Sequence, residues 1–146
     1  MRGELYTFGQ ATLFAFGGAE TDADLVNSDE EAARLVQPTH TEMKNGVNNA
    51  SEKKGIIDYF VTHEAPATIR ASLTDNRGGA LNEYLDRLMR ACKFEGWYFG
   101  CYHKDRSVAG VYNALYSDVE PLVKTGNFTV EKPRKIKEKH TEEKIK

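Results

Sequence analysis

The first part of the chain has the pattern of a β-hairpin. Two stretches of β-forming residues, "ELYTF" and "ATLFAF", flank Gly9-Gln10, and a two-residue break between such stretches is typical of a hairpin turn. The second stretch is apolar at every position from Leu13 to Phe16, which predicts a strand covered on both faces. Gly17-Gly18 then ends this strand.

Helical patterns follow at two places. Ser28 and Glu31 have the capping-box spacing ahead of an apolar run, which predicts a helix from residue 28 that ends at Pro38. Residues 80–92 place their apolar side chains on one face at helical spacing and predict a second helix. Residues 37–55 are polar and predict either a long loop or a short helix.

Three further stretches predict strands, namely "GIIDYFVTH" (55–63), "GWYFGCYH" (96–103) and "SVAGVYNALYSDV" (107–119), the last with one strand or two. Residues 64–79, with Pro66 and Gly78-Gly79, predict a loop. The order of elements predicts a mixed α/β (α+β) fold, a mixed β-sheet with flanking helices. We expect one domain over residues 1–127 and a charged, flexible tail over residues 128–146.

Composition narrows the function classes. The chain has 146 residues and a formal net charge of −2, a balance that favours neither nucleic acid nor an anionic membrane as partner. Residues 131–146 carry seven Lys or Arg against four Glu, so this stretch is basic and the remainder acidic. No apolar run is long enough to span a membrane, and "MRGELYTFGQ" lacks the pattern of a secretory signal, so we expect a cytoplasmic protein. Its two cysteines are expected to be thiols.

Three places offer metal-ligating side chains. His63 follows a predicted strand and is either a functional residue at the rim of the sheet or a loop histidine bonded to a backbone carbonyl. Cys101 and His103 are two residues apart, so on a strand they would share a face and suit zinc; alternatively they are a buried thiol and a histidine at a strand end. Asp22 and Asp24 are either cation ligands or turn-forming residues.

The aromatic residues and the basic tail raise a nucleic-acid alternative. Trp97, Tyr98, Phe99, Tyr112 and Tyr116 could stack on bases, but at strand spacing they are more typical of core and cross-strand pairs. The glutamates interleaved in the basic tail favour a solvated extension. Nucleic acid is therefore not the expected partner.

Taken in order, "RGELYTFGQATLFAFGGAETDAD", "DYFVTHEAP", "YLDRLMRACKFEGWYFGCYHKD" and "VYNALYSDVEPL" resemble the C-terminal half of bacterial and phage calcineurin-like metallophosphoesterases. The resemblance covers residues 2–123 and implies part of an αββα sandwich. The family uses two divalent metals (Mn, Fe, Zn or Ni) and a bridging hydroxide to hydrolyse phosphoesters. The resemblance implies that His63 and His103 match family ligands, and that Cys101 stands where the first histidine of G-H-x-H belongs.

The remaining ligand motifs of the family, D-x-H, G-D and G-N-H, have no counterpart in this sequence. Two or three ligands cannot hold two hard divalent ions. The resemblance therefore implies a truncated, degenerate and non-catalytic protein with no cofactor, which acts by binding a protein, such as an inhibitor of a host complex made by a phage or mobile element. The alternatives are a metal-dependent phosphoesterase, a subunit of a split one, or a mononuclear site (Zn, Mn or Fe) at His63, Cys101 and His103.

The absent half of the family's fold also predicts an uncovered sheet face. We expect Phe14, Phe16, Tyr59 and Phe99 to be exposed there and to bind a protein partner or a second copy of the chain.

Overall fold

The computed structural model describes residues 2–19 and 37–122, which form one mixed six-stranded sheet and three helices in an α+β arrangement. Fold class is thus confirmed at the level of a mixed sheet with flanking helices. The helix expected from residue 28, Asp22 and Asp24, and the tail from residue 128 lie outside the described residues.

The sheet grows outward from the predicted hairpin. Strands β1 (Arg2–Phe8) and β2 (Ala11–Phe16) pair antiparallel, and Gly9 provides the positive φ that the turn between them requires. Strands β3 (Tyr59–Thr62), β4 (Gly96–Phe99) and β6 (Tyr112–Ala114) then add parallel to β2 in this order. Strand β5 (Arg106–Val108) pairs antiparallel with β6 at the far edge. The last predicted stretch therefore contains two strands.

The three helices agree with the predictions from the sequence to different degrees. The predicted helix of residues 80–92 is present as α5 (Ala80–Ala91), with its apolar stripe on the core. Residues 37–55 form α3 (His40–Glu52), which begins with a reciprocal capping box between Thr39 and Glu42. The loop expected over residues 64–79 is wrong in part, because it contains α4 (Ala67–Thr74), preceded by Pro66.

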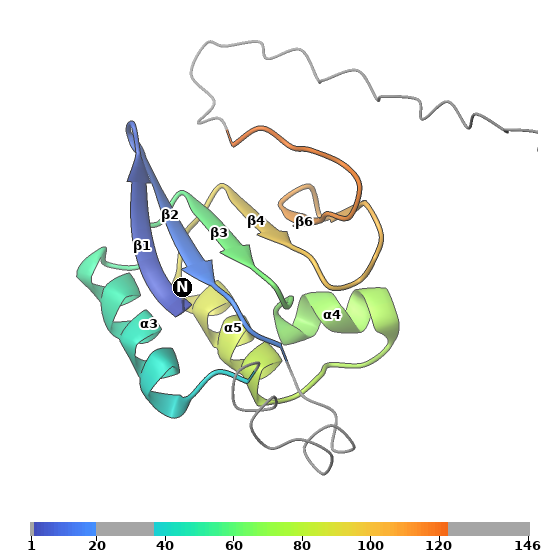
Figure 1. Cartoon of the computed structure of the whole chain (residues 1–146), viewed down its shortest axis with the longest axis horizontal. Helices are drawn as coiled ribbons and strands as arrows, with labels where there is room; N and C mark the ends of the chain where they lie inside the picture. Colours follow the sequence, from blue (N-terminus) through green and yellow to red (C-terminus); the bar gives the residue numbers. More distant parts are fainter. Residues whose placement is uncertain (1, 20–36, 123–146) are drawn as a thin grey trace, which may run out of the picture.

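All three helices lie on one side of the sheet (Figure 1). Strands β2, β3 and β4 are neighbours in chain order, and right-handed crossovers between successive parallel strands place their helices on the same face. The core lies between the two layers. There Phe14, Phe60 and Trp97 occupy one row of the register, and the Phe60 and Trp97 rings stack with centroids 4.3 Å apart.

The predicted exposure of Phe14, Phe16, Tyr59 and Phe99 is wrong, since each is at most 3% exposed. The three phenylalanines point toward the helices and belong to the core cluster. Tyr59 is on the opposite face of β3 from Phe60, where its hydroxyl donates a hydrogen bond to Glu95 (3.2 Å). Alternation along a strand separates two faces, but it does not say which of them the helices cover.

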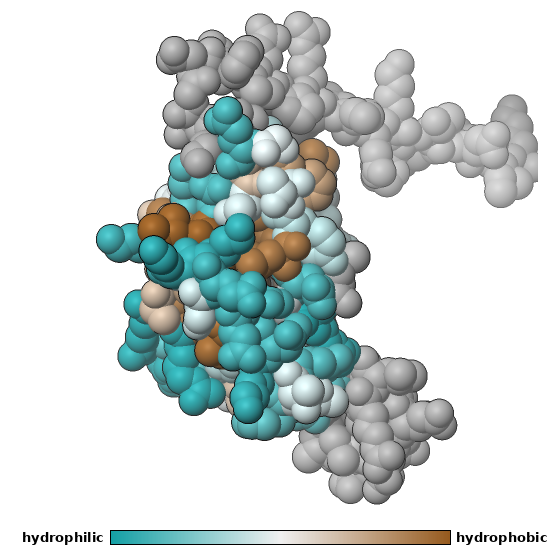
Figure 2. Space-filling view, turned by 90° about the vertical axis from the view of Figure 1, so that its left-hand side faces the viewer, coloured by the Kyte–Doolittle hydropathy of each residue, from teal (hydrophilic) through white to brown (hydrophobic). Residues whose placement is uncertain are grey.

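The surface on the side of β1 and α3 is largely hydrophilic, with hydrophobic residues gathered in smaller patches (Figure 2). None of the helices within residues 2–19 and 37–122 has both the length and the apolar character needed to cross a bilayer.

Candidate functional site

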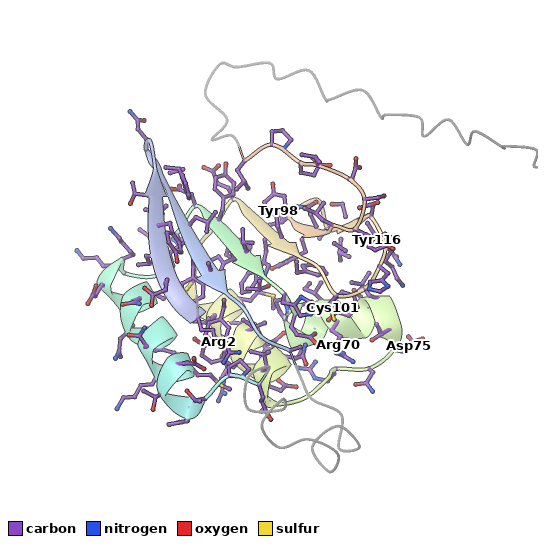
Figure 3. The ribbon with its side chains drawn as sticks, viewed as in Figure 1. Arg2, Arg70, Asp75, Tyr98, Cys101 and Tyr116 are labelled. Carbon is purple, nitrogen blue, oxygen red and sulfur yellow. The ribbon has the colours of Figure 1, made fainter. Side chains whose placement is uncertain are left out.

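The parallel strands β2, β3, β4 and β6 all end at one edge of the sheet, which we call the carboxyl edge. The loops that follow β3, β4 and β6 meet there, and open sheets with parallel strands gather their functional groups at this end. Figure 3 shows Cys101 and Arg70 close together at this edge, with Tyr116 on the same side of the molecule. His63, Cys101 and His103 all belong to these loops.

Glu64 is the centre of a buried hydrogen-bond network at the carboxyl edge. Its side chain is 3% exposed, and its Oε2 accepts hydrogen bonds from the Tyr102 hydroxyl (2.9 Å) and Asn82 Nδ2 (3.1 Å). Arg70 Nη1 lies 3.4 Å from the same oxygen and supplies the opposite charge. The carboxylate is therefore compensated by its neighbours.

The same network fastens four segments together. Asn82, on α5, also donates to the Ala65 carbonyl (2.9 Å) and accepts from the Gly79 N–H (3.0 Å). Tyr102, after β4, accepts from the Ala65 N–H (3.3 Å). The loops after β3 and β4 and the starts of α4 and α5 are thus held in one fixed arrangement.

Cys101 is part of this network through its thiol, whose Sγ lies 3.6 Å from Glu64 Oε1. Desolvation of the thiol and the negative charge of Glu64 raise the pKa of Cys101 to about 11. The thiol therefore stays protonated at neutral pH and donates to the carboxylate, whereas nucleophilic attack requires the thiolate. Its backbone has φ +72°, a left-handed conformation that is uncommon for a residue other than glycine.

His103 points to a different neighbour. Strand β4 ends at Phe99, so Cys101 and His103 lie in a turn and not on the strand that the sequence predicted. The His103 ring stacks on Tyr116, with centroids 5.0 Å apart and planes 22° apart. The shared strand face that would have brought the thiol and the imidazole together does not exist.

Asp105 fixes the loop that carries Tyr116. Its carboxylate accepts from the N–H groups of Tyr116 (2.7 Å), Ser117 (3.1 Å) and Asp118 (3.1 Å), and from the Ser117 hydroxyl (2.6 Å). These hydrogen bonds, led by that of the Ser117 hydroxyl, lower the pKa of Asp105 to about 2. Asp105 is therefore ionised at neutral pH and holds the turn after β6 in place.

His63 is exposed and lies beside Gly100, with its Nδ1 3.9 Å from the position that a Cβ of Gly100 would take. Its backbone N–H donates to the Phe16 carbonyl (3.3 Å), which extends the pairing of β2 with β3 by one residue. His63 is therefore at the rim of the sheet, as its sequence position suggests.

The predicted metal ligands His63, Cys101 and His103 do not surround a common point in the described part of the chain. Among the residues that the structure describes, no three His, Cys, Asp or Glu side chains are grouped so that they could hold one ion. The Cys101 thiol is bonded to Glu64 and the His103 ring faces Tyr116, so these two and His63 do not converge. The side chains of His63, Cys101, His103 and Tyr116 therefore present imidazole, thiol and aromatic groups at the carboxyl edge.

Sequence reasoning missed the residues that organise this edge. Glu64, Asn82 and Tyr102 were not singled out, because the hydrogen bonds that join Glu64 to Asn82 and to Tyr102 span 18 and 38 residues of the sequence. The only available signal was the polar Glu64 between a buried strand and Ala65-Pro66.

No protein-family model, curated protein or solved structure matches this chain.

Proposed function

We propose that this chain is a non-catalytic relative of the calcineurin-like metallophosphoesterases that acts by binding another protein at its carboxyl edge. The proposed kinship is supported by the two sequence segments that resemble the family most. "THEAP" and "WYFGCYHKD" lie more than thirty residues apart in the chain, and in the fold they are neighbours, since Tyr102 bonds to both Glu64 and Ala65.

The contacts of the matching residues support binding over catalysis. The family mechanism needs ligands that are free to bind metal, whereas here the Cys101 thiol is hydrogen-bonded to Glu64 and the His103 ring stacks on Tyr116. Two of the three positions that match family ligands are thus engaged within the chain.

One observation carries the binding proposal, namely the fixed and exposed Tyr116. Its side chain is 65% exposed, its ring stacks on His103, and its backbone is held by Asp105. A large aromatic side chain that is already ordered loses little conformational entropy on association, and tyrosine is frequent among the residues that dominate binding energy. Tyr116 is accordingly the expected anchor for a protein partner.

The test compares Tyr116→Ala with Phe8→Ala, a matched control because Phe8 is also aromatic and 65% exposed, at the far end of the hairpin. Tagged wild-type and variant proteins are used to purify bound proteins quantitatively from cells of the organism that encodes the chain. We expect Tyr116→Ala to reduce recovery of a specific partner at least about tenfold, and Phe8→Ala to leave it unchanged. Equal recovery with both variants would contradict the proposed anchor.

A second candidate function, metal-dependent phosphoester hydrolysis, is favoured by the position of His63 beside Gly100, which places both matching ligand segments at one edge. Bis-p-nitrophenyl phosphate with added Mn²⁺, Fe²⁺ or Zn²⁺ tests it. Turnover by wild-type protein that is lost in His63→Ala would replace the binding proposal with this one. We expect no turnover by the wild type or by Cys101→His, because a single restored histidine does not supply the other ligands.

A further inference from the structure

A groove of about 450 Å³ lies between α3 and α5, and all of its lining residues belong to these two helices. The four positions that each helix contributes have the spacing i, i+3, i+4 and i+7, from His40 on α3 and from Tyr84 on α5. Each helix therefore presents one continuous stripe to the groove over two turns. Two facing stripes of this kind form a cradle that is suited to a third helix.

The groove exists because α3 packs mainly on β1 and touches α5 only in part. Gly46 of α3 faces Gly3 of β1, and the Tyr84 hydroxyl of α5 donates to the Met43 carbonyl of α3 (2.8 Å). Farther out, Val47 is left 44% exposed on the groove wall. Met43, Leu88 and Ala91 complete the apolar lining.

The charges of the groove have one sign. Lys44 and Arg87 stand on opposite walls and His40 is at one end, whereas no carboxylate lines it. Within residues 2–19 and 37–122, neither Lys44 nor Arg87 forms an ion pair. The chain as a whole is slightly acidic, so this cationic lining is a local feature. Facing cations around an apolar floor are complementary to an amphipathic helix with acidic flanks.

We propose that the groove between α3 and α5 binds an acidic amphipathic helix of a partner protein. The apolar residues of that helix, at positions i, i+3, i+4 and i+7, would pack against Val47 and Leu88. Its Glu or Asp side chains would pair with Lys44 and Arg87. This surface is separate from the carboxyl edge and does not depend on Tyr116.

The experiment uses a fluorescent peptide of about 16 residues with Leu at i, i+3, i+4 and i+7 and Glu at the flanking positions. We expect saturable binding to the full chain by fluorescence anisotropy, and no binding of a peptide with Lys in place of each Glu. The double variant Lys44→Glu/Arg87→Glu should weaken binding at least about tenfold. The control Lys93→Glu/Arg106→Glu makes the same change in net charge at exposed positions outside the groove and should weaken it about twofold or less.

Circular dichroism of each variant establishes that it is folded. Val47→Asp is a second variant that should abolish binding, because it places a negative charge on the apolar wall of the groove. Equal binding by wild type and Lys44→Glu/Arg87→Glu would overturn the proposal. It would also be overturned if the peptide bound to the variant Leu35→Ser/Val36→Ser and not to the wild type, because the occupant would then be the chain's own residues 20–36. A dimer by light scattering that Val47→Asp dissociates would assign the groove to a second copy. Tyr116→Ala should leave peptide binding unchanged, which separates this test from that of the carboxyl edge.

Discussion

Glu64 is a negative charge held away from water, and its neighbours explain how the fold accommodates it. A buried carboxylate is destabilising by several kcal/mol unless it is paired and hydrogen-bonded. Here Arg70 supplies the charge and Tyr102 and Asn82 the hydrogen bonds. The Cys101 thiol is a further donor to Glu64. Removal of the carboxylate would take the acceptor from all four donors, which is the more damaging way to break such a network.

We therefore expect Glu64→Ala to lower the free energy of unfolding by roughly 3 kcal/mol. Urea denaturation followed by the fluorescence of Trp97, the single and fully buried tryptophan, measures this change. Glu83→Ala is the matched control, since it removes the partner of Arg77 from an exposed pair and should cause a much smaller loss. Equal losses in the two variants would mean that the network does not stabilise the fold.

The thiol of Cys101 gives a prediction that depends on pH. Because its pKa is raised to about 11 from an ordinary value of 9.0, the folded chain should be alkylated by iodoacetamide at pH 8 more slowly than the urea-unfolded chain. Glu64→Gln removes the nearby negative charge, lowers the pKa and should increase the rate. Peptide mass spectrometry distinguishes Cys101 from Cys92. Alkylation of folded and unfolded chain at the same rate would contradict the assigned environment.

The raised pKa of Cys101 also makes the stability of the fold depend on pH. Between pH 9 and 11 the unfolded chain releases the Cys101 proton while the folded chain keeps it. This contribution to stability is therefore complete below pH 9 and is lost as the pH rises through that range.

At these positions the sequence was informative about location and not about contacts. His63 was expected to follow a strand, and it directly follows β3. Strand β4 was expected to continue through His103, because a left-handed backbone at Cys101 and His103 leaves no mark in a run of aromatic residues. The direction in which each side chain points then depends on that turn.

The helices show where local signals compete. The polar stretch around Asn45-Gly46 has weak helix propensity, and it left α3 undecided, although Thr39 and Glu42 have the capping-box spacing that begins it. Helix α4 is eight residues long between Pro66 and Asp75, too short for a periodic pattern to outweigh the Pro and Gly residues around it. The regular apolar stripe of α5 was recognised because its spacing alone determines the buried face.

Gly46 is the contact point between α3 and the sheet, and it yields a prediction at the level of elements. A Cβ there would overlap the Tyr84 hydroxyl oxygen and lie 3.2 Å from the Gly3 Cα. Gly46→Ala should therefore destabilise the fold by roughly 1–3 kcal/mol, although alanine is the better helix former.

Asn48→Ala is the control, because Asn48 is exposed on the same helix and should be neutral or slightly stabilising. Thermal unfolding compares the two variants. If Gly46→Ala gained stability like the control, α3 would not be seated on β1 as closely as described.

At the scale of the molecule, α3, α4 and α5 of the described residues form a single layer on one face of the sheet. The mixed sheet with flanking helices was predictable from the alternation of strand and helix patterns. The side on which the helices lie follows from the strand order β2-β3-β4, which depends on pairings between distant residues and not on local periodicity. Phe14, Phe16 and Phe99 were expected on an open face because half of the resembled family's fold is absent from the sequence, and they are in the core.

The order of the strands also determines where the native state opens first. Strand β3 is hydrogen-bonded on both sides, whereas β5 is a three-residue edge strand with Arg106 and Ser107 exposed to water. Amide hydrogen exchange should therefore be slowest in β3 and begin in the β5–β6 hairpin. Asp105 and Tyr116 flank that hairpin. A partner that binds Tyr116 would therefore slow hydrogen exchange most in the β5–β6 hairpin, which opens most easily. Ligand recognition and local unfolding would then be linked through the same few hydrogen bonds.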